Sequence, residues 1–134
     1  MSVTKSDVLQ LRTEHDIVQA RQAVRKMTLE LGFSLVDQTK MVTAASELAR
    51  NTVIYGGGGV LQWEMLLDGA KKGLRLSFKD EGPGIADLAQ AMTDGWTSGS
   101  GLGLGLSGAK RLVNEFDVDS QPGKGTRVTI TRWK

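Results

Sequence analysis

The feature of this chain that most constrains its fold is a glycine-rich segment, Ser98-Gly-Ser-Gly-Leu-Gly-Leu-Gly-Leu106, which stands directly before a stretch with helical spacing. Neither a strand nor an ordinary turn needs glycine at every second residue. A loop that enters a helix can use glycines to bring backbone N–H groups around an anion, and the helix start adds unpaired donors and a partial positive charge. The segment therefore predicts an anion site. A simple hinge is the alternative, so partner motifs elsewhere in the chain have to decide.

The composition indicates one soluble domain with an ordinary core. The chain has 134 residues, of which 40% are hydrophobic and 24% are charged, as is typical of globular proteins. A formal net charge of +2 is too small to indicate binding to nucleic acid or to an anionic membrane. No apolar run is long enough to span a bilayer. With no cysteine and one histidine, His15, disulfides and zinc sites are not expected. We expect a single cytoplasmic domain over residues 1–134, without nucleic-acid or membrane partners.

The hydrophobic spacing predicts an α+β fold. Alternating apolar residues predict strands at 8–12, 60–67, 74–79, from 118 onward and at 126–133. Apolar residues at three- and four-residue steps predict helices at about 16–31, 35–55, 85–94 and 104–116. Gly32 is predicted to end the first helix and Ser34 to cap the second. The order βααββααββ is most simply arranged as helices on one face of a mixed, mostly antiparallel sheet.

A first candidate motif lies on the predicted helix 35–55. Glu47 and Asn51 are four residues apart, so they share one face of the helix. An amide oxygen can ligate Mg²⁺, and a carboxylate can orient or deprotonate an incoming hydroxyl. Taken by itself, however, this pair is better explained as part of a solvated helix face.

A second motif, Asp80-Glu-Gly-Pro-Gly-Ile85, directly follows the strand 74–79. Its glycines allow the backbone to turn tightly and to approach a flat ligand, and the Asp80 carboxylate could accept a hydrogen bond from an exocyclic amine such as that of adenine. A plain strand-to-helix turn would carry the same residue types. A fourth segment, Gly123-Lys-Gly-Thr126, predicts a hairpin turn and leaves open whether Thr126 also reaches a ligand.

The order of these four motifs resembles the nucleotide-binding domain shared by gyrase, Hsp90, histidine kinases and MutL, the GHKL superfamily. The resemblance covers about residues 8–132 and implies a Bergerat-type two-layer α/β sandwich that holds ATP between its helices and its sheet. By this resemblance Asn51 would hold Mg²⁺, Glu47 would be the general base and Asp80 would bind the adenine amine. The other residues that it assigns to the nucleotide are Gly82, Gly84, Ile85, Ser98, Gly99, Gly101, Leu102, Gly103, Leu104, Gly105, Leu106 and Thr126, with residues 96–100 as a short lid over ATP.

Further residues favour one branch of this superfamily, the stand-alone serine kinases of bacterial partner-switching pathways. The chain is too short for the gyrase and Hsp90 types, and His15 lacks the context of a phosphoacceptor. The segments Glu14–Val18 and Asp94–Ser98 resemble the stressosome switch kinases. So does Tyr55, which stands where anti-sigma kinases usually have a histidine. Arg21 matches an arginine that the anti-sigma kinases use at their partner surface, although a solvent-facing arginine would look the same.

This resemblance implies an ATP- and Mg²⁺-dependent serine/threonine kinase that phosphorylates a STAS-domain protein, with a PP2C-type phosphatase or a sigma factor as a further partner. Two alternatives stay open. One is an anti-sigma factor whose main output is sequestration of a sigma factor. The other is a nucleotide-gated binding module that activates a phosphatase.

Overall fold

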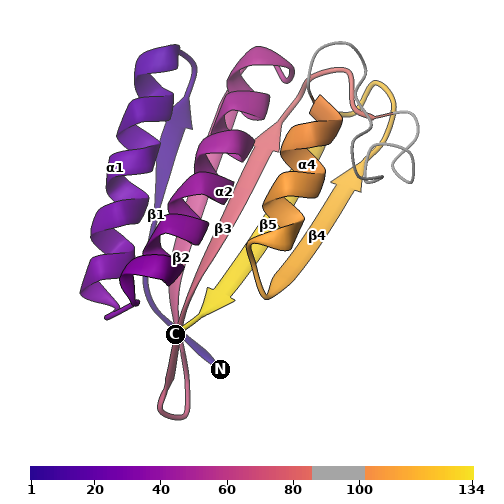
Figure 1. Cartoon of the computed structure of the whole chain (residues 1–134). Coiled ribbons are helices and arrows are strands. Elements are labelled where there is room, and N and C mark those ends of the chain that lie inside the picture. Colours follow the sequence, from indigo (N-terminus) through magenta and orange to yellow (C-terminus); the bar gives the residue numbers. More distant parts are fainter. Residues whose placement is uncertain (86–101) are drawn as a thin grey trace.

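The computed structural model describes residues 1–85 and 102–134, which form a two-layer α+β domain (Figure 1). Helices α1, α2 and α4 lie side by side on one face of a five-stranded sheet. The elements are β1 (Ser2–Leu11), α1 (Glu14–Glu30), α2 (Leu35–Ile54), β2 (Gly59–Asp68), β3 (Lys71–Asp80), α4 (Leu102–Arg111), β4 (Glu115–Ser120) and β5 (Thr126–Trp133). The predicted fold class, helices on one face of a sheet, is confirmed.

The strand order β1-β2-β3-β5-β4 places β3 at the centre of the sheet. The four described pairings are all antiparallel, where the sequence led us to expect a mixed, mostly antiparallel sheet. At its C-terminal end β3 carries Asp80, which pairs with Gly59 of β2 on one side and Thr126 of β5 on the other. The central strand therefore places Asp80 at one end of the sheet, between β2 and β5.

The two long helices begin at side-chain caps. Thr13 caps α1 in a capping box, in which its hydroxyl accepts from the Asp16 N–H and the Asp16 carboxylate accepts from the Thr13 N–H. Ser34 caps α2 as predicted, because its hydroxyl accepts from the Asp37 N–H at 3.1 Å. Such caps satisfy the N–H groups that a helix start leaves without partners.

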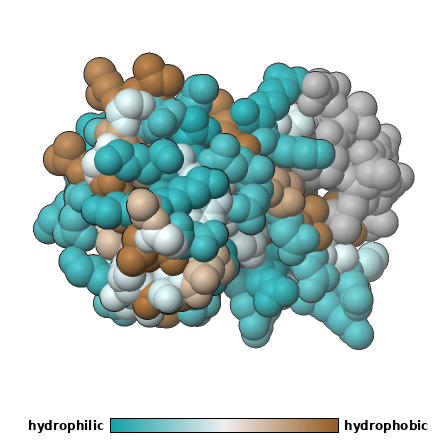
Figure 2. All heavy atoms as spheres, turned by 90° about the horizontal axis from the view of Figure 1, so that it is seen from below, coloured by the Kyte–Doolittle hydropathy of each residue, from teal (hydrophilic) through white to brown (hydrophobic). Residues whose placement is uncertain are grey.

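The core fills the space between the two layers. Apolar side chains of α2, such as Met41 and Leu48, are buried against Leu76 and Phe78 of β3. The end of the molecule seen in Figure 2 is mostly hydrophilic, and its hydrophobic side chains lie in small separate groups. None of the helices within residues 1–85 and 102–134 is long and apolar enough to cross a membrane.

Some predicted element bounds differ from the observed ones. The helix predicted at 104–116 ends at Arg111, and the chain then enters β4 at Glu115. Phe116 continues the helical spacing of Leu112 and Val113 and also alternates with Val118, and packing against the core selects the strand. The strand predicted at 8–12 begins already at Ser2, because β2 supplies backbone partners along this polar stretch. The helix predicted at 85–94 lies, apart from Ile85, outside the described residues.

Candidate functional site

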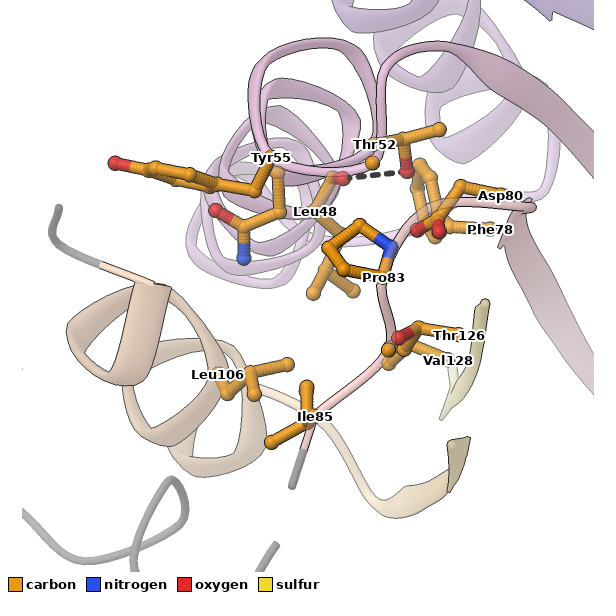
Figure 3. A pocket seen from close by; sticks show the side chains of 13 residues that line it. Leu48, Thr52, Tyr55, Phe78, Asp80, Pro83, Ile85, Leu106, Thr126 and Val128 are labelled. Carbon is orange, nitrogen blue, oxygen red and sulfur yellow. Dashed lines mark hydrogen bonds between the residues drawn. The ribbon is translucent and has the colours of Figure 1, made fainter. Parts of the chain in front are cut away.

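A pocket opens where the C-terminal ends of α2 and β3 meet α4 and the start of β5 (Figure 3). Leu106 and Ile85 point toward one another on one side of it, and Asp80 and Thr126 lie on the sheet side. Its lining residues are Leu48, Asn51, Thr52, Tyr55, Gly56, Phe78, Asp80, Pro83, Gly84, Ile85, Leu106, Thr126 and Val128. The fold thus brings together residues from all the predicted motifs. The volume of this open pocket is about 60 Å³, below the roughly 300–1,000 Å³ of typical ligand sites.

Asp80 is the acidic group of this pocket. Its carboxylate Oδ1 accepts a hydrogen bond from the Gly82 N–H at 2.9 Å. Burial raises the pKa of the Asp80 carboxyl above its usual value, and the backbone hydrogen bonds from Gly82 and Thr126 oppose that shift. One carboxylate oxygen is thereby hydrogen-bonded to the turn, and the carboxylate can still accept a hydrogen bond from a ligand in the pocket.

Glycines give the Asp80 carboxylate its room. A Cβ on Gly56 would lie 2.6 Å from Asp80 Oδ2, and a Cβ on Gly82 would lie 2.8 Å from the Gly56 Cα. Gly84 has φ +74°, and a Cβ there would overlap the Gln121 carbonyl. Bare backbone at Gly56 and Gly84 therefore lines this side of the pocket, and Gly82 packs against Gly56. The close approach of a flat ligand to Gly82 and Gly84 stays a prediction. Gly56 was expected only to end the helix.

A serine that the sequence analysis missed ties three segments of the wall together. Ser120 Oγ accepts from the Ile85 N–H at 2.8 Å, donates to the Gly125 carbonyl at 3.0 Å and lies 2.8 Å from the Thr126 hydroxyl. These bonds fix Thr126 at the edge of the pocket. A single serine at the end of a strand gives no sequence signal of such a role, because its partners are distant along the chain.

Asn51 supplies an amide on the helix side. Its Nδ2 is buried and has no hydrogen-bond partner in the described parts of the chain. A buried donor left unpaired costs about 1–3 kcal/mol, which marks this amide as a group that a ligand could complete. A Cβ on Gly105 would lie 2.8 Å from the same Nδ2, so the first turn of α4 rests directly on the amide.

The residues present fit a magnesium-bound nucleotide. No cluster of three or more His, Asp or Glu side chains that could hold a metal occurs among residues 1–85 and 102–134. Mg²⁺ commonly takes one or two protein oxygens and completes its shell with water and phosphate oxygens. The Asn51 amide oxygen is a suitable protein ligand, and the Asp80 carboxylate is a suitable acceptor for an amine.

Glu47 and Arg21 lie outside this pocket. Glu47 is exposed on α2, one turn before Asn51, and it lines a groove between α1 and α2 together with Arg21 and Ser46. Arg21 reaches across this groove, and its Nε and Nη2 donate to Ser46 Oγ at 3.2 and 2.9 Å. Glu47 therefore faces the side from which another protein could approach.

Part of the predicted phosphate loop lies outside the described residues, namely Ser98, Gly99, Gly101 and the lid at 96–100. Leu102, Gly103 and Leu104 form the first turn of α4 together with Gly105. Leu106 is buried and lines the pocket. The start of α4 therefore lies beside the pocket, and the role of the glycine-rich segment as an anion site stays a prediction.

Comparisons with known proteins agree with this geometry. A family model described as "Histidine kinase-, DNA gyrase B-, and HSP90-like ATPase" matches residues 36–134. The chain is 46% identical over 125 residues to the serine/threonine-protein kinase RsbT of Bacillus subtilis, a match that covers 93% of this chain and 94% of that protein. It is 29% identical over 120 residues to an anti-sigma F factor of a Thermoanaerobacter species, covering 85% and 82% of the two chains.

Two solved structures share the fold. The RsbU and RsbW domains of a Mycobacterium tuberculosis protein match 98% of this chain over 33% of theirs, with a TM-score of 0.66 and 24% identity. The SiaB–SiaC complex of Pseudomonas aeruginosa matches 98% of this chain over 91% of its own matched chain, with a TM-score of 0.54 and 13% identity.

Proposed function

Because the chain belongs to the family of histidine kinase-, DNA gyrase B- and HSP90-like ATPases, and is a protein serine/threonine kinase of that family, we propose that it phosphorylates a STAS-domain protein in a bacterial partner-switching pathway. ATP is the phosphate donor and Mg²⁺ its companion ion. The pocket carries this proposal, because its lining combines the Asp80 carboxylate, the Asn51 amide and bare glycine backbone with residues of α4 and β5. We place the reaction in the cytoplasm, where ATP is available.

Adenine recognition is assigned to the sheet side of the pocket. The Asp80 carboxylate would accept a hydrogen bond from the exocyclic amine of adenine. Phe78, Ile85 and Leu106 offer apolar surface to the faces of the ring. The glycine wall lets the ring approach the backbone closely.

Phosphoryl transfer depends mainly on positioning and on neutralising charge. Asn51 would hold Mg²⁺, which when bound neutralises the negative charge on the phosphate oxygens. The start of α4 would bind phosphate with its free N–H groups. Glu47 would accept the proton of the incoming serine, and its exposed place beside the α1–α2 groove suits a hydroxyl that arrives on another protein.

The same groove is our candidate for the partner surface. Arg21 and Arg25 line it from α1, and Ser46 and Glu47 line it from α2. A partner that reaches Glu47 therefore passes Arg21. A phosphatase or a sigma factor is a further candidate partner, and the likeness to an anti-sigma F factor favours sigma sequestration as the second candidate function.

The decisive experiment incubates the protein with Mg-ATP and candidate STAS-domain proteins and measures phosphoserine by mass spectrometry. A positioned general base contributes about 10²–10⁴-fold, so Glu47→Ala should slow transfer by that factor while ATP affinity stays near that of the wild type. Glu30→Ala is the matched control, because Glu30 is an exposed glutamate on α1 that pairs with Lys5. No phosphoserine with any STAS protein, together with a stable sigma complex, would overturn the proposal.

A further inference from the structure

We infer that Gly105 is a positioning residue whose missing side chain holds the Asn51 amide in its place over the nucleotide site. The inference rests on the proposed function, since it concerns the residue to which we assign Mg²⁺. It concerns the contact between α2 and α4, which lie side by side on the sheet (Figure 1). The sequence pattern grouped Gly105 with the other glycines of the phosphate loop, whereas its neighbours in the fold point to a different task.

Gly105 and Asn51 are in close contact. Gly105 is buried in the first turn of α4, and Asn51 lies in the last turns of α2. A Cβ built on Gly105 would lie 2.8 Å from Asn51 Nδ2, 3.2 Å from Oδ1 and 3.4 Å from Cγ. Cβ atoms essentially never approach another heavy atom to less than 3.0 Å. The α4 backbone therefore rests on the amide at a distance that only glycine permits.

Packing holds the Asn51 amide at its nitrogen. Asn51 Nδ2 is buried and has no hydrogen-bond partner within residues 1–85 and 102–134. At its nitrogen, the position of the Asn51 amide is therefore determined by packing against Gly105 and not by a hydrogen bond. A methyl group at position 105 would push on both polar atoms at once, so the amide would have to rotate away.

A second glycine on the same helix has different surroundings. Gly108 lies three residues later in α4, and a Cβ there would meet no atom of the described residues within 4 Å. Alanine is favoured over glycine inside a helix, so the sequence keeps a helix-weakening residue at both positions while the packing requires it at only one. Gly108→Ala is therefore a matched control for Gly105→Ala.

The test measures ATP affinity by calorimetry in Mg²⁺ and in EDTA, for the wild type and for variants of the full chain. Gly105→Ala should lower the affinity in Mg²⁺ by about tenfold, a coupling typical of residues in contact, and leave the affinity in EDTA close to that of the wild type. In an Asn51→Ala background the same substitution should change affinity less than about twofold. Gly108→Ala should behave as the wild type does.

A second readout needs no ligand. Gly105→Ala should lower the melting temperature because the new methyl group meets the Asn51 amide, and Gly105→Ala combined with Asn51→Ala should recover most of that loss. This measurement also decides the case in which Gly105→Ala alone does not fold.

Three results would overturn the inference. One is an equal loss of affinity in Mg²⁺ and in EDTA, which would mean that Gly105 contacts phosphate directly. Another is full additivity of the two substitutions, and the third is a Gly105→Ala variant indistinguishable from Gly108→Ala. Failure of the wild type to bind ATP at all would instead overturn the proposed function, and the inference with it.

Discussion

Asp80 reaches the pocket because Gly56, on the chain segment that follows α2, leaves space for its carboxylate. The Gly82 N–H then fixes one carboxylate oxygen, and burial raises the pKa of the group. Desolvated acceptors of this kind discriminate strongly between ligands, because a wrong partner leaves a buried polar group without a hydrogen bond. We therefore propose that Asp80 determines which base the pocket accepts.

Replacing Asp80 with asparagine should weaken ATP binding by about 10–100-fold, the cost of one buried unpaired donor. The asparagine oxygen would take the Gly82 N–H, and its NH₂ group would then face the adenine amine, donor against donor. Calorimetry with Mg-ATP measures the effect. Asp117→Asn is the control, since Asp117 is exposed on β4. Equal affinities of the two variants would refute the assignment of Asp80.

One arginine of β5 links this strand to α2 and to the end of α4. Arg132 of β5 donates from Nη2 to Asp37 Oδ1 in the first turn of α2 at 2.6 Å, and from Nη1 to the Leu112 carbonyl just after α4 at 2.8 Å. The hydrogen bond from Arg132 lowers the pKa of Asp37 below its usual 3.8. This bridge fixes the far ends of the two helices whose other ends, at Asn51 and Gly105, form the candidate site.

Breaking the bridge should destabilise the fold in a pH-dependent way. Asp37→Asn should lower the free energy of unfolding at pH 7 by about 1–2 kcal/mol, typical of a charge-assisted hydrogen bond. Because the pKa of Asp37 is lower in the folded state than in the unfolded state, this stability is present above pH 3.8 and is lost as the pH falls through the folded pKa. The deficit of the variant should therefore shrink on acidification.

Urea unfolding of Asp37→Asn and the wild type at pH 7 and at stepwise lower pH measures this dependence, with Asp117→Asn as the comparison. A deficit that stays constant from pH 7 to the acid limit would contradict the expected role of the bridge.

The elements also show what a sequence can predict. Hydrophobic period placed α1, α2, β2 and β3 nearly correctly, because each has a buried stripe of its own. The same spacing wrongly extended the predicted helix to Phe116, because an apolar residue at this position fits both the helical and the strand period. Motif order predicted Asp80, Asn51 and Thr126 for one pocket. It missed Gly56 and Ser120, because their roles depend on neighbours far away in the chain.

The family that the motif order implied is confirmed, and so is the kinase class that further residues favoured. The roles of Glu47 as base, Arg21 as partner contact and the loop from Ser98 to Leu106 as phosphate cradle stay predictions. These roles depend on ligands and on a second protein, and neither leaves a mark in the spacing of apolar residues.

At the scale of the whole molecule, the candidate site lies at one end of the sandwich, where residues of both layers converge. A nucleotide bound there would touch α2, β3, β5 and α4 together. A ligand that binds only the folded protein stabilises it, by about 2.7 kcal/mol at one hundred times its dissociation constant. Binding at such a junction therefore acts on the stability of the entire domain.

We accordingly expect the melting temperature to rise steadily with the concentration of Mg-ATP. Thermal scans at increasing nucleotide concentration measure this, and Asp80→Asn should need a correspondingly higher concentration for the same rise. A melting temperature that is indifferent to Mg-ATP in the wild type would contradict binding at the junction of the two layers.

Helix α2 stands between α1 and α4 on the sheet and contributes both to the groove with Arg21 and to the pocket with Asn51. A docked partner protein and a bound nucleotide would therefore contact neighbouring segments of the same helix. A tilt or rotation of α2 imposed by a docked partner would act directly on the residue that we assign to Mg²⁺. Substitutions within this single helix of 20 residues would therefore affect partner docking and ATP turnover together.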